Sequence, residues 1–270
     1  MSDKLSTWEE AVIWLRSQPD QAGLTRACYY DDPLIDAADR FYRSSEWAEI
    51  QKKITGNNGR VLDLGAGRGI SSYAFSRDGW DVVALEPDPS NIVGAGAIRS
   101  LMRESNLQTG IIRAYAESLP FKNSTFDAVY GRQILHHAQN LRTMCNEIAR
   151  VLKPGGVFIA TREHVISRPE DLPIFLEQHP LQKMYGGENA FLLRQYQDAL
   201  ANSGIKMTEI LNQFNSDINL FPQSITLRKK QLAEKFCFPF PSLIPSILVT
   251  IRGTFDTTPG RLYSFIGRKK

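Results

Sequence analysis

From residue 60 onward, short apolar runs alternate with stretches of helical periodicity. The runs predict strands at 61–64, 81–85, 110–114, 126–130 and 156–161. Between the fourth and fifth runs, apolar residues recur at helical spacing from Leu141 to Leu152, and Lys153-Pro154-Gly155-Gly156 closes that helix. Because strands that alternate with helices are typical of βαβ units, the pattern predicts a doubly wound α/β core with a parallel sheet.

Two helices are expected before this core. Ser6 and Glu9 have capping-box spacing, and apolar residues at helical spacing follow them. A second helix is expected over about 36–54, ending in Gly56-Asn57-Asn58-Gly59. Residues 1–58 are therefore interpreted as an N-terminal helical appendage to a domain that spans residues 59–270.

Two irregular segments interrupt the second half of the chain. The regularity lapses over about 165–189, and the segment 212–260 is proline-studded and aperiodic. A helix over 190–203 that stops at Gly204, and strands at 205–211 and 261–267, lie around them. Neither irregular segment has the periodic apolar content for a core of its own, so both are expected to be cap-like insertions over one edge of the sheet.

Composition narrows the class of protein. Of the 270 residues, 42% are apolar and 23% are charged, which excludes a disordered or collagen-like chain. The net charge of +3 gives no broad basic surface for nucleic acid. Three widely spaced cysteines lack metal-site or redox spacing, and the acidic N-terminus does not resemble a signal peptide. The longest uncharged stretch, 236–251, contains prolines and is shorter than the ~20 residues of a membrane span. We expect a cytoplasmic protein without an integral membrane segment.

The stretch Val61-Leu62-Asp63-Leu64-Gly65-Ala66-Gly67-Arg68-Gly69 carries the most chemical information. A strand runs into three glycines and then a helix, so a ligand can approach the backbone and the amides at the helix N-terminus. A dinucleotide fold would place a third glycine or an alanine where this chain has Ile70, so the spacing disfavours NAD. Arg68 is interpreted as a solvated residue at the helix start.

Glu86 ends the second expected strand, 23 residues after Asp63. In doubly wound nucleotide-binding folds, an acid at this place accepts hydrogen bonds from ribose hydroxyls. Glu86 therefore predicts a nucleoside-containing ligand without choosing among them.

Five motifs in this order resemble the class I S-adenosylmethionine-dependent methyltransferases, in the small-molecule branch that includes the ubiquinone and menaquinone biosynthesis methyltransferases. The resemblance covers about residues 60–161. The motifs are Asp63-Leu64-Gly65-Ala66-Gly67-Arg68-Gly69, Glu86, Ala116-Glu117-Ser118-Leu119-Pro120-Phe121, Ser124-Thr125-Phe126-Asp127 leading to Leu135-His136-His137, and Leu152-Lys153-Pro154-Gly155-Gly156. The resemblance implies a Rossmann-like sheet of seven strands with an antiparallel last strand, and S-adenosylmethionine as cofactor.

The family's roles carry over to matching positions only. The resemblance places Asp63, Gly65, Ala66 and Gly67 at the amino-acid end of the cofactor and Glu86 at its ribose. Ala116 and Glu117 lie near the adenine, and Gly131 and Arg132 line the methionine portion. Many relatives have Asp just before that alanine, whereas this chain has Tyr115, so either Tyr115 packs against the adenine or Glu117 supplies the acceptor.

His136, His137 and His164 follow the fourth and fifth expected strands, at the sheet edge where doubly wound folds bind ligands. Each is a candidate general base for an oxygen or nitrogen acceptor, and each could instead bond only to the backbone. Glu163 points to the same side, and His179, Tyr185 and Glu188 in the first insertion are weaker candidates.

The implied reaction is direct methyl transfer to a small metabolite or biosynthetic intermediate, with alignment and water exclusion as the protein's main tasks. No metal is required by that chemistry. A non-catalytic S-adenosylmethionine-binding sensor or partner subunit, and a nicotinamide-dependent oxidoreductase, remain alternatives. Residues 236–251 are interpreted as part of a lid packed on the core, with a lipid-facing or anion-binding surface as the alternative. Oligomeric state is not indicated.

Overall fold

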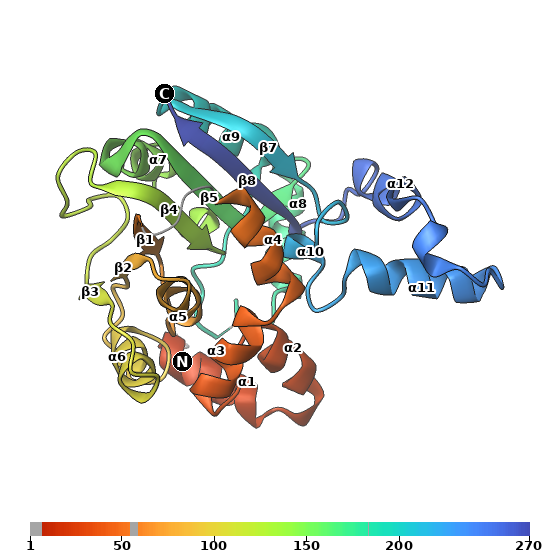
Figure 1. The fold of residues 1–270 in the computed structure, drawn as a ribbon, viewed down its shortest axis with the longest axis horizontal. Helices are drawn as coiled ribbons and strands as arrows, with labels where there is room; N and C mark the ends of the chain where they lie inside the picture. Colours follow the sequence, from red (N-terminus) through yellow and green to blue (C-terminus); the bar gives the residue numbers. More distant parts are fainter. Residues whose placement is uncertain (1–6, 55–58, 183) are drawn as a thin grey trace.

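A mixed β-sheet forms the centre of the chain in this computed structural model, which describes residues 7–54, 59–182 and 184–270 (Figure 1). Its order is β3-β2-β1-β4-β5-β8-β7, and the short β6 pairs with β5. The strands are β1 (Arg60–Leu64), β2 (Asp81–Leu85), β3 (Gly110–Ile112), β4 (Phe126–Arg132), β5 (Leu152–Ile166), β6 (Phe191–Leu192), β7 (Ile205–Leu211) and β8 (Arg261–Lys269). The predicted doubly wound sheet is confirmed, with β6 as an unpredicted addition.

Strand direction also follows the prediction. All pairings among strands β1 to β6 are parallel. Strand β8 is antiparallel to both β5 and β7. Chain order reverses at β1, which has β2 on one side and β4 on the other. In doubly wound folds a ligand binds outside the carboxyl ends of the strands at such a reversal.

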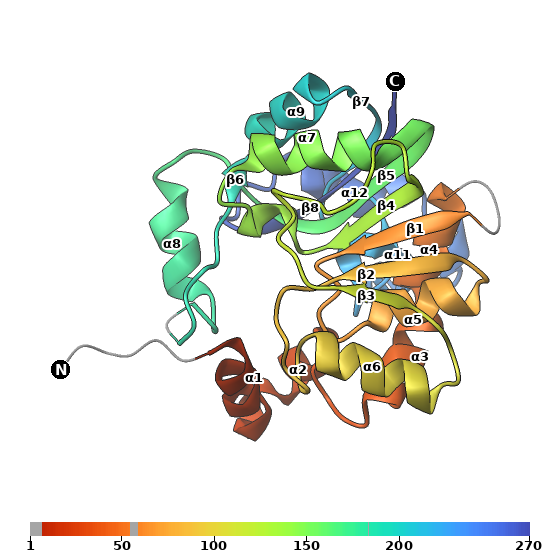
Figure 2. The same ribbon diagram turned by 90° about the vertical axis from the view of Figure 1, so that its left-hand side faces the viewer.

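Successive strand residues point to opposite faces of the sheet, and helices cover both faces (Figures 1 and 2). Val61 packs in one apolar cluster with α3 (Leu34–Tyr42), α4 (Ser45–Lys53), α5 (Ile70–Arg77) and α6 (Ala95–Glu104). Leu62 packs in the other with α7 (Leu141–Val151) and α9 (Leu193–Asn202). The fold is therefore a three-layer α/β/α arrangement.

The N-terminal helices differ from the prediction in their boundaries. Helix α1 (Trp8–Ser17) is capped by Thr7 and Glu10, one residue later than the expected Ser6 and Glu9, and Ser6 lies outside the described residues. It is followed by η1 (Pro19–Gln21) and α2 (Ala22–Ala27). The single helix expected over 36–54 is α3 and α4, because the Ser44 hydroxyl accepts a hydrogen bond from the Trp47 amide and starts a new helix. The expected end at 56–59 falls mostly outside the described residues.

Arg68 is a buried connector between the N-terminal helices and the glycine loop. The prediction that it is solvated is wrong, since its side chain is buried. Its guanidinium donates to the carbonyls of Tyr29, Asp31 and Ile92 and to the Asp32 carboxylate. These bonds attach the segment after α2 to the start of α5.

Three boundaries after residue 150 also need correction. Lys153-Pro154-Gly155-Gly156 continues into β5 and does not form a separate cap after α7. The helix expected over 190–203 is shorter, because residues 191–192 pair with β5 as β6 before α9 begins. The last strand, expected over 261–267, extends to Lys269, whose ammonium donates to the Leu152 carbonyl at 2.7 Å.

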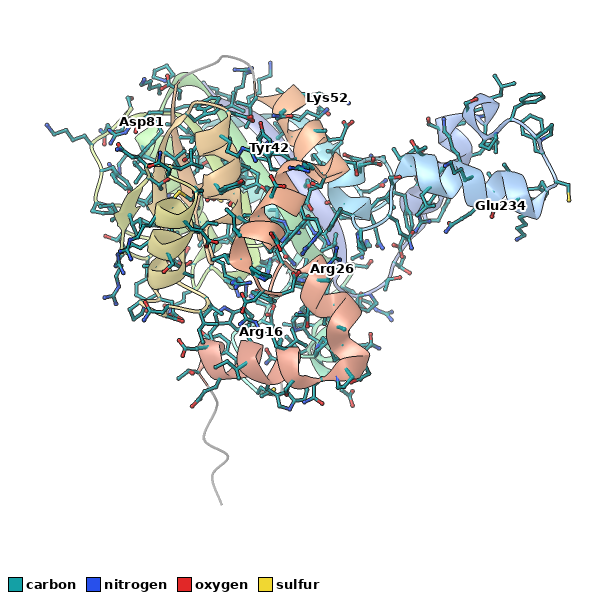
Figure 3. The ribbon with its side chains drawn as sticks, turned by 60° about the horizontal axis from the view of Figure 1, so that its bottom comes forward. Arg16, Arg26, Tyr42, Lys52, Asp81 and Glu234 are labelled. Carbon is teal, nitrogen blue, oxygen red and sulfur yellow. The ribbon has the colours of Figure 1, made fainter. Side chains whose placement is uncertain are left out.

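The two insertions adopt different arrangements. The first contains α8 (Asp171–Gln178), whose Phe175 packs in a small apolar cluster beside β5. In the second, α10 (Asp217–Leu220) packs against the sheet, whereas α11 (Ile225–Lys235), η3 (Pro241–Leu243), α12 (Ser246–Thr250) and η4 (Ile251–Thr254) form an arm that projects from the body (Figure 1). Figure 3 shows Glu234 on this arm, away from the labelled residues of the body.

The prediction that residues 236–251 belong to a lid packed on the core is therefore wrong. Most of the arm's large apolar side chains are exposed, including Phe236, Phe238, Phe240, Leu243, Ile247, Leu248, Ile251 and Phe255. The arm buries Ala233, Ile244 and Val249. Across the described ranges, no helix combines the length and apolar character needed to cross a membrane.

Candidate active site

The turn from β1 into α5 is built on glycines with left-handed backbone. Gly65, Gly67 and Gly69 have φ of +66°, +53° and +82°. A Cβ at Gly65 would lie 2.5 Å from the Ile134 side chain, and the same is true at Gly131. A Cβ at Gly67 would have the Val93 carbonyl oxygen, at 4.0 Å, as its nearest neighbour. A side chain at Gly65 or Gly131 would thus collide with Ile134, whereas a side chain at Gly67 would enter open space.

Asp63, at the end of β1, anchors the helix that follows the loop. Its carboxylate accepts hydrogen bonds from the Ser71 and Ser72 hydroxyls at 2.8 and 2.5 Å. Burial raises the pKa of Asp63 to about 6, and the two hydroxyls oppose that shift by stabilising the charged form. Asp63 is thus satisfied within the protein, and its predicted contact with the amino-acid end of a cofactor stays a prediction.

Glu86, at the end of β2, is hydrogen-bonded to the backbone of the glycine loop. One carboxylate oxygen accepts a hydrogen bond from the Gly67 amide at 2.8 Å, and the other accepts one from the Asp88 amide at 2.9 Å. Desolvation raises the pKa of Glu86 to about 7 despite these bonds. The residue predicted to bind a ribose therefore lies directly against the residue predicted to border the cofactor.

The residues expected near the adenine lie on the loop after β3. Tyr115 is 70% exposed, so within the described residues it is available for stacking and is not part of the core. Ala116 is buried in the apolar cluster beneath α7. Glu117 accepts a hydrogen bond from the Gln139 amide at 2.9 Å, which leaves its second oxygen for a ligand.

Arg132, at the end of β4, has its guanidinium committed to Glu46 of α4. Its Nε donates to Glu46 at 2.8 Å, and the pair is buried. The proximity of Glu46 raises the pKa of Arg132 against the opposing effect of burial. The side chain fixes α4 to the sheet, so the predicted contact with the methionine portion could come only from the backbone of Arg132.

All four histidines of the chain gather at the carboxyl ends of β4 and β5. The ring centroids of His136 and His164 are 4.7 Å apart, and those of His136 and His137 are 4.2 Å apart. The ring centroids of His164 and His179 are 5.8 Å apart. The predicted convergence of the three candidate bases is thus seen in the structure. His179, one of the weaker candidates, is far in sequence from the other three histidines, and nothing in the sequence indicates that α8 ends beside β5.

Hydrogen bonds fix the orientation of these rings. The Nδ1 of His164 lies 2.8 Å from the Gly260 carbonyl, and that of His137 lies 3.0 Å from the Gly187 carbonyl. Since a carbonyl only accepts, the Nδ1 of each ring is the donor, and the neutral form of that tautomer has its lone pair on Nε2. His136 Nδ1 lies 2.7 Å from the Glu163 carboxylate, which also accepts from the Ile134 and His136 amides.

The buried histidines differ from the exposed one in their environment. Burial lowers the pKa of both His136 and His164 well below the ordinary range, because the charged imidazolium is desolvated. His137 is exposed. Glu188, another weaker candidate, lies 3.8 Å from His136 Nε2 and 3.8 Å from His179 Nδ1.

Surface cavities elsewhere do not coincide with these residues. A cavity of about 890 Å³ lies beside α2 and α3, and one of about 670 Å³ lies beside β3 and α6. The first is lined by Asp31, Asp32 and Arg40, which already form ion pairs among the N-terminal helices. The strand ends are better supported as the site, because the glycine loop, Glu86 and the histidines all lie at the carboxyl ends of the parallel strands.

Comparison with known proteins gives relatives for the central part of the chain. The family described as "Methyltransferase domain" matches residues 62–160. A ubiquinone biosynthesis O-methyltransferase of Rhizobium etli is 28% identical over 155 residues, covering 56% of this chain and 61% of that protein. The O-methyltransferase resE of Aspergillus sclerotiorum is 27% identical over 222 residues, covering 78% of each chain. The first relatives are thus matched over about half to three fifths of their length.

A solved structure shares the fold at low identity. The [4+2]-cyclase SpnF superposes with a TM-score of 0.58 at 19% identity, covering 87% of this chain and 81% of that one. The sheet order, the loop and the matched region define a class I methyltransferase fold. Residues 62–160 match the methyltransferase domain family, and the chain resembles the class I S-adenosylmethionine-dependent methyltransferases of ubiquinone biosynthesis.

Proposed function

We propose that this chain binds S-adenosylmethionine and transfers its methyl group to a small metabolite or biosynthetic intermediate. The observation that carries the proposal is the contact between Glu86 and Gly67, because it joins an acid at the ribose position to the open glycine of the loop. Residues 59–270 form the methyltransferase domain, residues 1–58 bring helices to it, and the protein acts in the cytoplasm.

The cofactor spans the carboxyl ends of β1, β2 and β4 in this proposal. Gly65, Ala66 and Gly67 border its amino-acid end beside Asp63, and Gly131 and the backbone of Arg132 line its methionine portion. Tyr115, Ala116 and Glu117 flank the adenine. The relatives support this use of the domain, since ubiquinone biosynthesis O-methyltransferases and resE are described as methyltransferases.

The histidines form the acceptor end of the site. His137 is the best arranged of the three candidate bases, because its Nδ1 donates to the Gly187 carbonyl, which orients Nε2 as the acceptor on an exposed side chain. His136 and His164 are buried or nearly so. With an active acceptor, His137→Ala at saturating cofactor is expected to lower kcat by about 10²–10⁴-fold. A change of only a few-fold would leave positioning as the mechanism.

Binding and turnover separate the alternatives. A ligand that binds only the folded chain raises its apparent stability, so S-adenosylmethionine and S-adenosylhomocysteine should raise the melting temperature while NAD and NADP should not. Stabilisation by NAD alone would favour an oxidoreductase. Cofactor binding without transfer to any of a panel of phenolic, carboxylate and amine acceptors, followed with a labelled methyl group, would favour a sensor or partner subunit.

A further inference from the structure

Two imidazoles and one carboxylate converge at the end of β5. His136, His164 and Glu188 each offer one ligand atom, and these atoms lie within 4.8 Å of one another. The Nδ1 atoms of both histidines are engaged elsewhere, so both Nε2 atoms are left for the shared space. Two imidazole nitrogens and a carboxylate are a ligand set that binds zinc and other divalent transition metals.

We propose that His136, His164 and Glu188 bind a divalent transition-metal ion, with Zn²⁺ as the probe. The inference is independent of methyl transfer, since it rests on the placement of the three side chains. Ligands at about 2.1 Å from a tetrahedral ion lie about 3.4 Å apart. The 3.8 Å between His136 Nε2 and Glu188 is close to that value, and the three ligand atoms, all within 4.8 Å of one another, would draw together on an ion.

The hydrogen-bond partners of the two histidine Nδ1 atoms are of the kind found at metal sites. The Glu163 carboxylate holds His136 Nδ1 at 2.7 Å, and the Gly260 carbonyl holds His164 Nδ1 at 2.8 Å. Metal-binding histidines characteristically donate their second ring N–H to a carboxylate or a backbone carbonyl in this way, which orients the ring. Glu163 is thus a positioning residue for His136.

A fourth histidine gives an independent indication. His179 Nδ1 is buried and has no hydrogen-bond partner among the described residues, and it lies 3.8 Å from Glu188. A buried polar atom without a partner is unfavourable, so a group that would satisfy it is expected nearby. A water on the ion or an adjustment of Glu188 would supply that partner.

An ion held by three protein ligands keeps coordination positions open. At the acceptor end of the site it would orient an oxygen of the acceptor and make a bound hydroxyl more acidic. This consequence, unlike the metal site itself, rests on the proposed function, and it favours acceptors with a phenolic hydroxyl or a carboxylate.

The test is Zn²⁺ binding by the full chain after treatment with a chelator. Equilibrium dialysis with elemental analysis should give one Zn²⁺ per chain, and Co²⁺ in its place should give visible absorption bands. Glu188→Gln and His164→Ala should each weaken Zn²⁺ binding by about 100-fold or more, and Glu163→Gln by about 10–100-fold. The matched control is His137→Ala, which removes a neighbouring imidazole outside the trio and should keep Zn²⁺ affinity within about threefold of the parent.

Two results would overturn the metal site. One is the absence of stoichiometric Zn²⁺ in the parent chain. The other is Zn²⁺ that is retained equally by folded Glu188→Gln and His164→Ala, which would place it elsewhere. Circular dichroism establishes that the variants fold. Calorimetry with S-adenosylhomocysteine on the same samples reports on the proposed cofactor site, so failure of one proposal is distinguishable from failure of the other.

Discussion

The Glu86 carboxylate accepts a hydrogen bond from the Gly67 amide, with 2.8 Å between the two atoms. The bond links the end of β2 to the loop after β1, across a pair of adjacent parallel strands. Glu86 is therefore fixed before a ligand arrives, and its second oxygen is held by the Asp88 amide. Preorganisation of this kind reduces the ordering that binding would otherwise require.

Replacing Glu86 should weaken cofactor binding. A hydrogen bond to a charged group contributes about 1.5–3 kcal/mol, so Glu86→Gln should lower the affinity for S-adenosylhomocysteine by about tenfold or more. Calorimetry measures the change. Asp81→Asn is the matched control, because this exposed acid lies at the other end of the same strand and forms an ion pair with Arg60. Equal affinities for Glu86→Gln and the parent would remove Glu86 from the site.

Cofactor affinity should depend on pH through Glu86. Burial raises its pKa to about 7, and the ionised carboxylate accepts stronger hydrogen bonds from ribose hydroxyls than the protonated form does. Affinity should therefore fall as pH drops below 7, by up to roughly tenfold per unit, and level off above about pH 8. Titrations of S-adenosylhomocysteine at pH 6 and 8 measure this, and Glu86→Gln should flatten the profile. A flat parent profile would contradict the assignment.

The same group makes an opposite contribution to the stability of the ligand-free chain. Because the folded pKa of Glu86 lies above its ordinary value of 4.5, the folded chain retains a proton that the unfolded chain releases between pH 4.5 and about 7. Its contribution to the free energy of unfolding is largest below that window and decreases as pH rises through it. Denaturation of parent and Glu86→Gln at pH 5 and 8 should show a smaller decrease in the variant.

Gly67→Val should block the cofactor site while leaving the fold intact. Gly67 has φ +53° and open space where a Cβ would lie, so the new side chain meets the ligand and not the protein. Gly155→Val is the control, since Gly155 also has positive φ, at +76°, and nothing within 4 Å of a Cβ. Both variants should lose about 1–2 kcal/mol of stability, but only Gly67→Val should lose S-adenosylhomocysteine binding. Retained affinity in folded Gly67→Val would refute the loop assignment.

The Glu46–Arg132 pair should be a major determinant of stability. Both side chains are nearly or fully buried, so Glu46→Ala leaves an uncompensated guanidinium and should lower the free energy of unfolding by about 3–5 kcal/mol. The double variant Glu46→Leu/Arg132→Met should recover most of that loss. Urea denaturation measures both. If the free energy of unfolding of Glu46→Ala lies within about 1 kcal/mol of the parent's, the pair is not desolvated.

Some features depend on local sequence, and these were predictable. The β1 strand, the glycine loop and Glu86 are close in the chain, and short apolar runs between helical stretches are the local signal of buried strands. Helix α7 is predictable from a different local signal, the recurrence of apolar residues at helical spacing. Boundaries were less predictable where a single cap decides them: Ser44 divides one apolar pattern into α3 and α4, although either side of it favours helix.

The sequence by itself determined the class of fold and indicated the candidate cofactor residues, because the motifs are continuous segments whose backbone requirements are local. Only the tertiary structure decided that Arg132 pairs with Glu46, 86 residues away, and that Arg68 is buried. It also brought Glu188 within 3.8 Å of both His136 and His179 and made residues 225–254 a projecting arm. Contacts between distant segments depend on how whole elements pack, and no spacing along the chain encodes that packing.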